Sequence, residues 1–83
     1  MVAVTSANHN LVRIVCPVDE QRPFTGTIGV ARRPRIGDVG VVVHAYSQDL
    51  VAVECVDAQG MTLWLADFHL SELEPVESRD PVA

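Results

Sequence analysis

The chain has 83 residues and a net charge of −5, and 48% of its residues are hydrophobic whereas only 5% are aromatic. A chain of this length forms one domain with a single core. All 6 basic residues are arginine, which excludes a phosphate-binding loop of the G-x-x-x-x-G-K type and Schiff-base chemistry on lysine. The negative net charge disfavours general attraction to nucleic acid or to an anionic membrane.

We expect one folded domain over residues 11–76, between a flexible N-terminus at residues 1–10 and a flexible C-terminal tail at residues 77–83. The first ten residues lack the basic region and the apolar run of a signal peptide, and no stretch of the sequence approaches the roughly 20 apolar residues that span a membrane. The pattern predicts a soluble, cytoplasmic protein. Cys16 and Cys55 form no C-x-x-C pair, so we expect buried, reduced thiols that react slowly.

The most β-prone stretch is IGDVGVVVHAY at residues 36–46. Gly37 and Gly40 lie where the chain must turn tightly and then pass close to a neighbouring backbone. Three consecutive valines follow at residues 41–43, and residues branched at Cβ favour a strand over a helix. The stretch therefore predicts a central strand.

The remaining elements follow from alternation and turn residues. Residues 11–16 predict a first strand, and residues 18–35 an irregular loop with a short ribbon at 25–31. Residues 50–56 and 61–66 predict a hairpin through the turn at 57–60. Residues 67–73 have the spacing of one helical or 3-10 turn with Asp67 as its N-cap, and residues 73–76 predict a short closing strand.

Strict alternation assigns the faces of these strands. In the strand at 61–66 it turns Leu63 and Leu65 inward and leaves Thr62 and Trp64 facing outward. The full predicted core comprises Val12, Ile14, Val39, Val42, Val51, Val53, Leu63, Leu65 and Leu73. The fold class that these elements indicate is all-β, a small SH3-like barrel of about five antiparallel strands with a 3-10 turn before the last strand.

Two motifs carry a resemblance to known families: GDVGVVV at residues 37–43 and VECVDAQG at residues 53–60. With them, the chain resembles a family of small bacterial proteins that have a G-D-V-G-x-V-V strand followed by a V-E-[aromatic]-V-D-x-x-G hairpin. Cys55 stands at the aromatic position, and the loop at 18–35 is longer than in that family. The resemblance implies an SH3-like barrel without enzyme activity. Gly37, Gly40 and Val42 are more distantly similar to the KOW motif of transcription and ribosomal factors.

We expect no catalytic, cofactor-binding or metal-binding residues. The possible zinc ligands lack the short spacings that pre-form half a site: His9, His44, His69, Cys16 and Cys55. A Cys–His nucleophile pair is disfavoured because burial in an apolar core raises the pKa of a thiol and suppresses the thiolate. No acidic pair suited to acid–base catalysis is evident either, so the sequence favours a protein that is not an enzyme.

Two features suit a binding protein. Residues 22–36 contain Arg22, Arg32, Arg33 and Arg35 without one acidic residue, whereas residues 67–80 are rich in acids. These arginines fold back to pair with the acidic end, stay solvated, or bind a partner. The second feature is Trp64 with Thr62, an uncharged outer face that the long loop covers, that a second copy covers in a homodimer, or that stays free for another protein.

The leading functional hypothesis is a non-enzymatic protein–protein binding module, of an accessory, immunity or antitoxin-like kind, that acts either by self-association or by docking on another protein. Its partner-binding residues would be Trp64 and Thr62 with the four arginines of the loop. The alternative is a nucleic-acid-binding, KOW-like barrel that uses Arg32, Arg33 and Arg35. The acidic net charge speaks against this alternative, and no small-molecule substrate is indicated.

Overall fold

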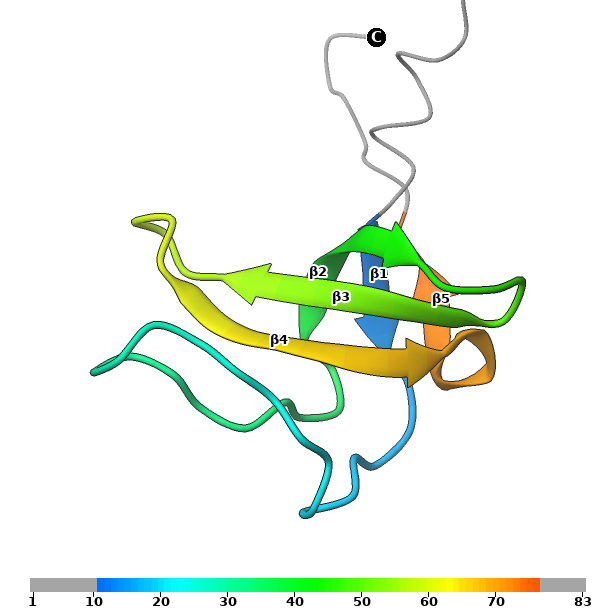
Figure 1. Cartoon of the computed structure of the whole chain (residues 1–83), viewed down its shortest axis with the longest axis horizontal. Helices are drawn as coiled ribbons and strands as arrows, with labels where there is room; N and C mark the ends of the chain where they lie inside the picture. Colours follow the sequence, from blue (N-terminus) through cyan, green and yellow to red (C-terminus); the bar gives the residue numbers. More distant parts are fainter. Residues whose placement is uncertain (1–10, 77–83) are drawn as a thin grey trace, which may run out of the picture.

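A computed structural model of the chain describes residues 11–76, so the predictions for residues 1–10 and 77–83 lie outside the described residues. The elements in chain order are β1 (Leu11–Ile14), β2 (Val39–Ala45), β3 (Leu50–Val56), β4 (Thr62–His69), the 3-10 helix η1 (Leu70–Glu72) and β5 (Leu73–Pro75). They form one sheet in the order β4-β3-β2-β1-β5, in which all neighbouring strands are antiparallel (Figure 1).

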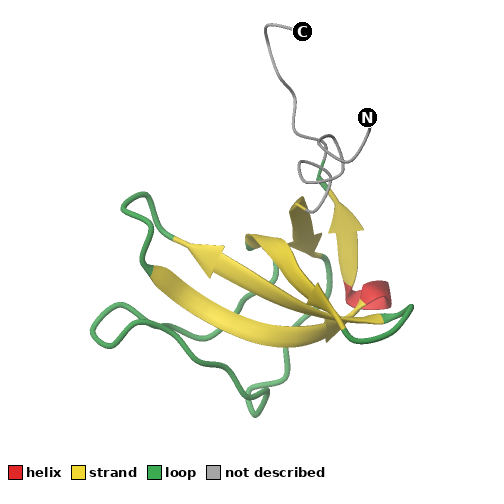
Figure 2. Ribbon diagram, turned by 45° about the horizontal axis from the view of Figure 1, so that its top comes forward, coloured by secondary structure: helices red, strands yellow, loops and turns green. Residues whose placement is uncertain are grey.

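The predicted all-β class, the five antiparallel strands and the 3-10 turn before the last strand are confirmed. The sheet is not closed into a barrel, because its edge strands β4 and β5 pair with β3 and β1 and not with each other. The turn η1 connects these two edge strands in the chain and lies at the same end of both (Figure 2).

Gly37 and Gly40 have the two roles expected of them. Gly37 has φ of 94°, a left-handed conformation that suits only glycine in the turn before β2. A Cβ on Gly40 would lie 2.7 Å from the carbonyl oxygen of Glu54 and 2.7 Å from Cγ1 of Val53, so glycine allows β2 to approach β3. Beyond this contact a register shift between Val42 and His44 interrupts the pairing.

The β3–β4 hairpin turns at Asp57, as predicted. Its carboxylate oxygen Oδ1 accepts hydrogen bonds from the backbone N–H groups of Gln59 and Met61, both at 2.9 Å, and Gly60 supplies the positive φ of 84°. The hairpin pairs Cys55 with Trp64 and continues to the pair Leu50 and His69. The register therefore places alternate β4 residues from Trp64 onward on the same face as the inward residues of β3.

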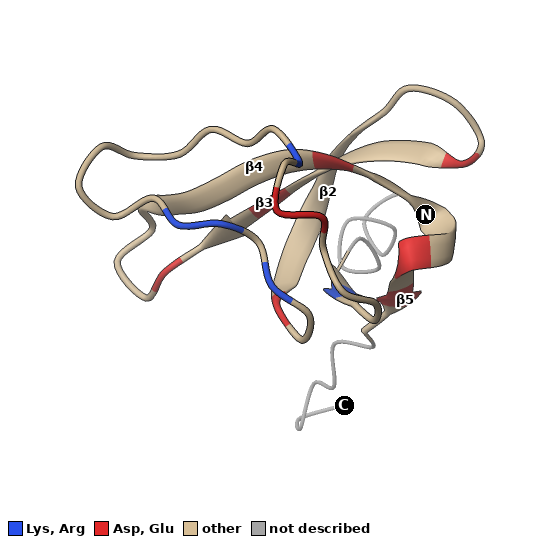
Figure 3. Ribbon diagram, turned by 90° about the horizontal axis from the view of Figure 1, so that it is seen from below, with Lys and Arg blue, Asp and Glu red and all other residues tan. Residues whose placement is uncertain are grey.

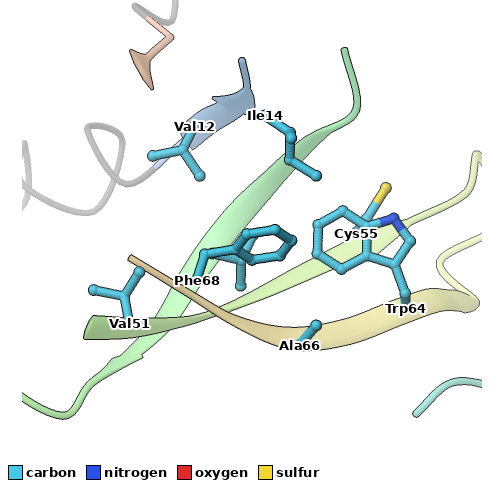
Figure 4. Close-up of a cluster of buried hydrophobic side chains, with 8 residues drawn as sticks. Val12, Ile14, Val51, Cys55, Trp64, Ala66 and Phe68 are labelled. Atoms are coloured by element: carbon cyan, nitrogen blue, oxygen red, sulfur yellow. The ribbon is translucent and has the colours of Figure 1, made fainter. Parts of the chain in front are cut away.

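The prediction that Trp64 faces outward is wrong, because its side chain is 0% exposed. β4 continues to His69 instead of ending at residue 66, so Trp64, Ala66 and Phe68 form one inward row. The rings of Trp64 and Phe68 have centroids 5.6 Å apart and an interplanar angle of 57° (Figure 4). This aromatic pair is the centre of the core.

The rest of the predicted core is partly confirmed. Val12, Ile14, Val51 and Val53 are buried, and Val42, Leu63 and Leu73 are partly buried against them. The assignment of Val39 and Leu65 to the core is wrong, since their side chains are 38% and 36% exposed. Val39 alternates with Gly40, which faces inward opposite Val12, and Leu65 alternates with the inward Trp64.

Two further boundaries differ from the prediction. Asp67 is not the N-cap of η1, because it lies within β4, and His69 is the residue that precedes the turn. The Glu72 carboxylate accepts a hydrogen bond from the backbone N–H of His69 at 2.9 Å and so stabilises the turn. β1 ends at Ile14, and Cys16 is half-buried rather than buried, whereas Cys55 lies in the core and both thiols are free.

The long loop between β1 and β2 runs beside the outer edge of β4 (Figure 1). Thr25 and Leu65 exchange two backbone hydrogen bonds, at 3.1 and 2.8 Å. Further along, the Thr27 N–H donates to the Thr62 carbonyl at 2.9 Å and the Arg32 N–H donates to the Leu63 carbonyl at 3.0 Å. In place of the ribbon expected at residues 25–31, the loop forms a single β-bridge between Thr25 and Leu65, flanked by the backbone hydrogen bonds of Thr27 and Arg32. The loop thereby covers part of the outer edge of β4.

Candidate functional site

Some of the charged residues of the described range are committed to the fold by ion pairs. Three ion pairs join Arg13 to Glu74, Arg22 to Glu72 and Arg32 to Asp38. Within residues 11–76, no three His, Cys, Asp or Glu side chains gather in a way that could hold a metal ion. No helix of this part of the chain has the length and apolar character needed to cross a membrane.

Arg22 joins the long loop to η1. Its guanidinium donates to both Glu72 carboxylate oxygens, at 3.1 and 2.7 Å, and to the Asp67 carbonyl at 2.9 Å. The cation lies 4.5 Å from the centroid of the Phe68 ring. Only 18% of the Arg22 side chain and 17% of the Glu72 side chain are exposed, and the hydrogen bonds between them raise the pKa of Arg22 and lower the pKa of Glu72.

Arg32 is the second arginine that folds back. Its guanidinium donates to the Asp38 carboxylate at 2.8 and 3.0 Å, and the same carboxylate accepts the indole N–H of Trp64 at 2.9 Å. Burial alone would raise the pKa of Asp38, but hydrogen bonds from Arg32, the Arg35 backbone N–H and Trp64 outweigh it and lower that pKa. The prediction that loop arginines pair with the acidic end is therefore confirmed for Arg22, whereas Arg32 pairs with Asp38, which lies outside residues 67–80.

The other two arginines remain exposed. Arg33 donates to the Glu20 carbonyl and lies 5.7 Å from the centroid of the Phe24 ring. Arg35 donates through its backbone N–H to Asp38, and its side chain forms no ion pair with any residue in 11–76. In Figure 3 the arginine segments follow the long loop while acidic segments lie on η1 and β5. The four arginines do not form one free basic surface, because two of them are paired.

Trp64 and Thr62 do not provide the predicted binding face. Trp64 has no exposed surface, and Thr62 is half-buried. The Thr62 hydroxyl donates to a Glu54 carboxylate oxygen at 2.5 Å, and its backbone N–H donates to the Thr27 hydroxyl at 3.1 Å. Loop residues therefore occupy the space beside Thr62 that a partner would have used.

The structure instead places a groove between the loop and β4. One hollow of about 280 Å³ is lined by Arg22, Pro23, Leu50, Asp67 and His69. A second hollow of about 210 Å³ is lined by Pro23, Phe24, Thr25, Leu65, Ala66 and Asp67. Because the two hollows share Pro23 and Asp67, we treat them together as the Pro23–Asp67 groove.

Tyr46 contacts the Pro23–Asp67 groove through Asp67. The Tyr46 hydroxyl donates to Asp67 Oδ1 at 3.0 Å, and this hydrogen bond raises the pKa of Tyr46. The His44 and Tyr46 rings meet edge to face with their centroids 4.7 Å apart. The groove thus combines apolar walls with an exposed carboxylate whose position is fixed by a tyrosine.

Most residues of this groove were not among the predicted site residues; only Arg22 was. Asp67 was assigned to a helix cap, and Pro23 and Phe24 lie in a loop whose path the sequence does not specify. A signal was present in the β4 sequence: the spacing of Trp64 and Phe68 would have extended the strand through His69 and placed Asp67 on its outer face. The contact between loop and strand had no comparable signal.

Two other surfaces are notable. An apolar cavity of about 400 Å³ lies between β5 and the β2–β3 pair, lined by Val12, Val42, Val51, Leu70, Leu73, Glu74 and Pro75. On the opposite, outer face of β2, Val39, Val41 and Val43 are exposed at alternate positions. Neither surface contains an unpaired charge among the side chains named here.

Comparison with known proteins identifies no relative: no protein-family model, no curated protein and no solved structure matches this chain.

Proposed function

We propose that this protein is a non-enzymatic protein-binding domain that takes a segment of its partner into the Pro23–Asp67 groove. The observation that carries the proposal is the groove itself, in which Pro23, Leu50 and Leu65 offer apolar contacts beside the exposed Asp67 carboxylate. Sites of this kind bind through apolar surface and gain specificity from a few polar groups.

The state of the reactive and charged side chains also supports a non-enzymatic role. Burial raises the pKa of the Cys55 thiol, which disfavours a nucleophilic thiolate there. The carboxylates of Asp38 and Glu72 are held by arginines within the fold. These groups stabilise the structure and are not available for acid–base chemistry.

The strand order and the 3-10 turn before β5 support the finer proposal of an SH3-like arrangement in which the barrel is incompletely closed. Membership of the small bacterial family with the G-D-V-G-x-V-V strand is a separate proposal. The two motifs at residues 37–43 and 53–60 support it.

The second candidate is nucleic-acid binding through Arg33 and Arg35, favoured by the exposure of both residues in the last part of the long loop, before β2. The pairing of Arg22 and Arg32 removes half of the predicted basic cluster. A homodimer built on Trp64 is not proposed again, since the indole is buried.

A displayed library of random peptides tests the leading proposal. Peptides selected on the folded protein should bind in solution, and the exchange Leu50→Asp should abolish that binding because it puts a charge on an apolar wall of the groove. Ile28→Asp is the matched control, since Ile28 is 97% exposed and does not line the groove. Circular dichroism and thermal unfolding should show that both variants are folded.

Failure to select any peptide, or selected peptides that bind Leu50→Asp as well as the wild-type protein, would overturn the proposal. Binding of a single-stranded oligonucleotide that is lost in the double variant Arg33→Ala/Arg35→Ala would instead establish the second candidate. The two functions are therefore separated by a variant at Leu50 in β3 and by variants at Arg33 and Arg35 in the long loop.

A further inference from the structure

We propose that the segment bound in the Pro23–Asp67 groove is extended, about three to four residues long in its contacts, and carries a cationic side chain next to an apolar one. This inference rests on the proposed function and adds the chemistry of the partner. It commits to a basic peptide segment of another protein rather than to an anionic or purely apolar ligand.

The charge around the groove favours a cation. Asp67 lines both hollows, is exposed and forms no ion pair with residues 11–76. Asp67 is the one acid that lines either hollow, so its carboxylate is the negative charge that a ligand in the groove would meet.

Arg22, the arginine that lines the groove, does not offset the charge of Asp67, and the Arg33 guanidinium lies outside the lining, 5.7 Å from the centroid of the Phe24 ring. Both terminal nitrogens of the Arg22 guanidinium donate to Glu72, which neutralises it and orients it toward η1. An anionic ligand would have to break this paired contact or approach Asp67 without compensation. A cationic side chain meets neither obstacle.

The hydrogen bond from Tyr46 fixes the carboxylate that would receive the cation. Because the Tyr46 hydroxyl donates to Asp67 Oδ1, the second carboxylate oxygen is left to accept another donor. An acceptor held in place loses less side-chain freedom on binding than a mobile one does. Asp67 is therefore a pre-positioned specificity residue for a lysine or an arginine.

The walls and the length of the groove set the other features. Pro23 and Leu50 stand beside Asp67 in the first hollow, and Phe24 and Leu65 in the second, so an apolar side chain next to the cation has a surface to cover. The groove follows β4 from Leu65 to His69, and at about 3.4 Å per residue this distance suits three to four residues of an extended chain.

A positional peptide array provides the test. Immobilised five-residue acetylated peptides carry one of the natural amino acids at the central position and equimolar mixtures elsewhere, and binding of the full chain is measured at low and at physiological salt. We expect arginine and lysine to give the strongest central-position signal, and the signal to fall with salt. The best peptide, synthesised alone, should lose about fivefold in affinity when its cation is replaced by glutamine.

Asp67→Asn is the decisive variant, because asparagine keeps an acceptor for Tyr46 while it removes the charge. It should weaken the basic peptide about fivefold and leave the glutamine peptide unchanged. Glu74→Gln is the control with the same change of charge at an exposed residue outside the groove. The Asp67→Arg variant should reverse the preference toward acidic central residues.

The outcomes separate the two proposals. Selection of neutral or acidic peptides that still depend on Leu50 would leave the proposed function standing and overturn the partner class. Equal loss of the basic and the glutamine peptide in Asp67→Asn would overturn it as well, because it would show a structural role for the carboxylate. Absence of any peptide binding that depends on Leu50 would overturn both.

Discussion

The Asp38 carboxylate accepts the indole N–H of Trp64 at 2.9 Å while Arg32 holds the same carboxylate. Asp38 belongs to the turn that precedes β2, and Trp64 is the most deeply buried aromatic residue of β4. One acid thus supplies the hydrogen bond that a buried tryptophan needs and anchors the end of the long loop.

Asp38→Ala should therefore lower the free energy of unfolding by about 2 kcal/mol or more, since it leaves a buried donor and an arginine without a partner. Asp38→Asn should lose less, because its amide oxygen can still accept the indole N–H. Urea denaturation measures both. Arg35→Ala is the control, expected to stay within about 0.5 kcal/mol, because Arg35 reaches Asp38 through its backbone. A wild-type unfolding curve for Asp38→Ala would show that the Trp64 contact is not stabilising.

Trp64 should report a fully apolar environment. As the single tryptophan and 0% exposed, it should emit at blue-shifted wavelengths and resist quenching by acrylamide until the protein unfolds. Trp64→Ser should cost about 3–5 kcal/mol, a large part of the roughly 4–12 kcal/mol expected for a chain of this size, and should move the urea midpoint to a much lower concentration. Red-shifted, readily quenched emission from the native protein would contradict the buried position.

Acid should destabilise the protein through two carboxyl groups. The pKa of Glu72 is lowered mainly by the Arg22 hydrogen bonds, and the pKa of Asp38 is lowered by Arg32, Arg35 and Trp64 against the effect of burial. Since the folded state binds these protons more weakly than the unfolded state, this stability is present above the unfolded values of about 4 and is lost as the pH falls through the lower folded values.

Urea denaturation between pH 7 and pH 3 checks this expectation. Glu72→Gln should be less stable than the wild-type protein at pH 7 and should lose less stability on acidification. Glu20→Gln, an exposed residue outside the ion pairs of the described range, should keep the wild-type dependence. A Glu72→Gln curve parallel to that of the wild-type protein would exclude the Arg22–Glu72 pair as a source of acid sensitivity.

The two thiols should differ in reactivity. Cys55 is buried, and burial raises the pKa of its thiol, whereas Cys16 is half-buried at the start of the long loop. Labelling with a maleimide in native buffer, followed by mass spectrometry, should modify Cys16 first. The Cys16→Ser variant should lose the fast phase, and equal rates at both positions would contradict the placement of Cys55.

Two glycine substitutions should show how much stability depends on the close approach of strands at Gly40 and how much on the positive φ at Gly37. Gly40→Ala should lower stability by about 2–3 kcal/mol, because its Cβ meets the backbone oxygen of Glu54 at 2.7 Å and β2 must move away from β3. Gly37→Ala meets no atom within 4 Å and should cost only about 1 kcal/mol for its positive φ. Urea denaturation of both variants, with Gly29→Ala as a loop control, measures the difference.

Local patterns predicted the strands better than the loops. The bounds 50–56 and the inward row Val51, Val53 and Cys55 match β3, although Ala52 on its other face is also buried, and the turn residues Asp57 and Gly60 fix its hairpin. Alternation failed in β4, where an apolar residue stands at every position from 63 to 66, so that either parity offers a hydrophobic row. Phe68 extends the row of Trp64 and Ala66, and the Asp38 carboxylate accepts the Trp64 indole N–H, so this row faces inward. Asp38 lies far from β4 in the sequence.

The candidate groove could not be derived from the sequence for a related reason. Its two sides are the loop at residues 22–25 and the strand from Leu65 to His69, which come together through the Thr25–Leu65 bridge and the Arg22–Glu72 pair. Such contacts depend on side chains from distant segments, and neither composition nor periodicity encodes their partner. The charge segregation of the sequence indicated that loop arginines and late acids could meet, and Arg22 is where they do.

The path of the long loop also bears on how the protein behaves at high concentration. Along β4, loop residues bond the carbonyls of Thr62, Leu63 and Leu65, so an incoming strand finds that edge occupied.

At the other edge, bonds from the Val15 N–H to Glu72 and from the Val76 N–H to Leu11 turn the even-numbered residues of β5 toward β1. The outward positions are Leu73, whose N–H donates to the Leu70 carbonyl, and Pro75, which has no N–H. Neither border of the sheet therefore presents a row of free donors to a second chain, and fibrillar stacking by strand addition requires the loop to detach from β4 first.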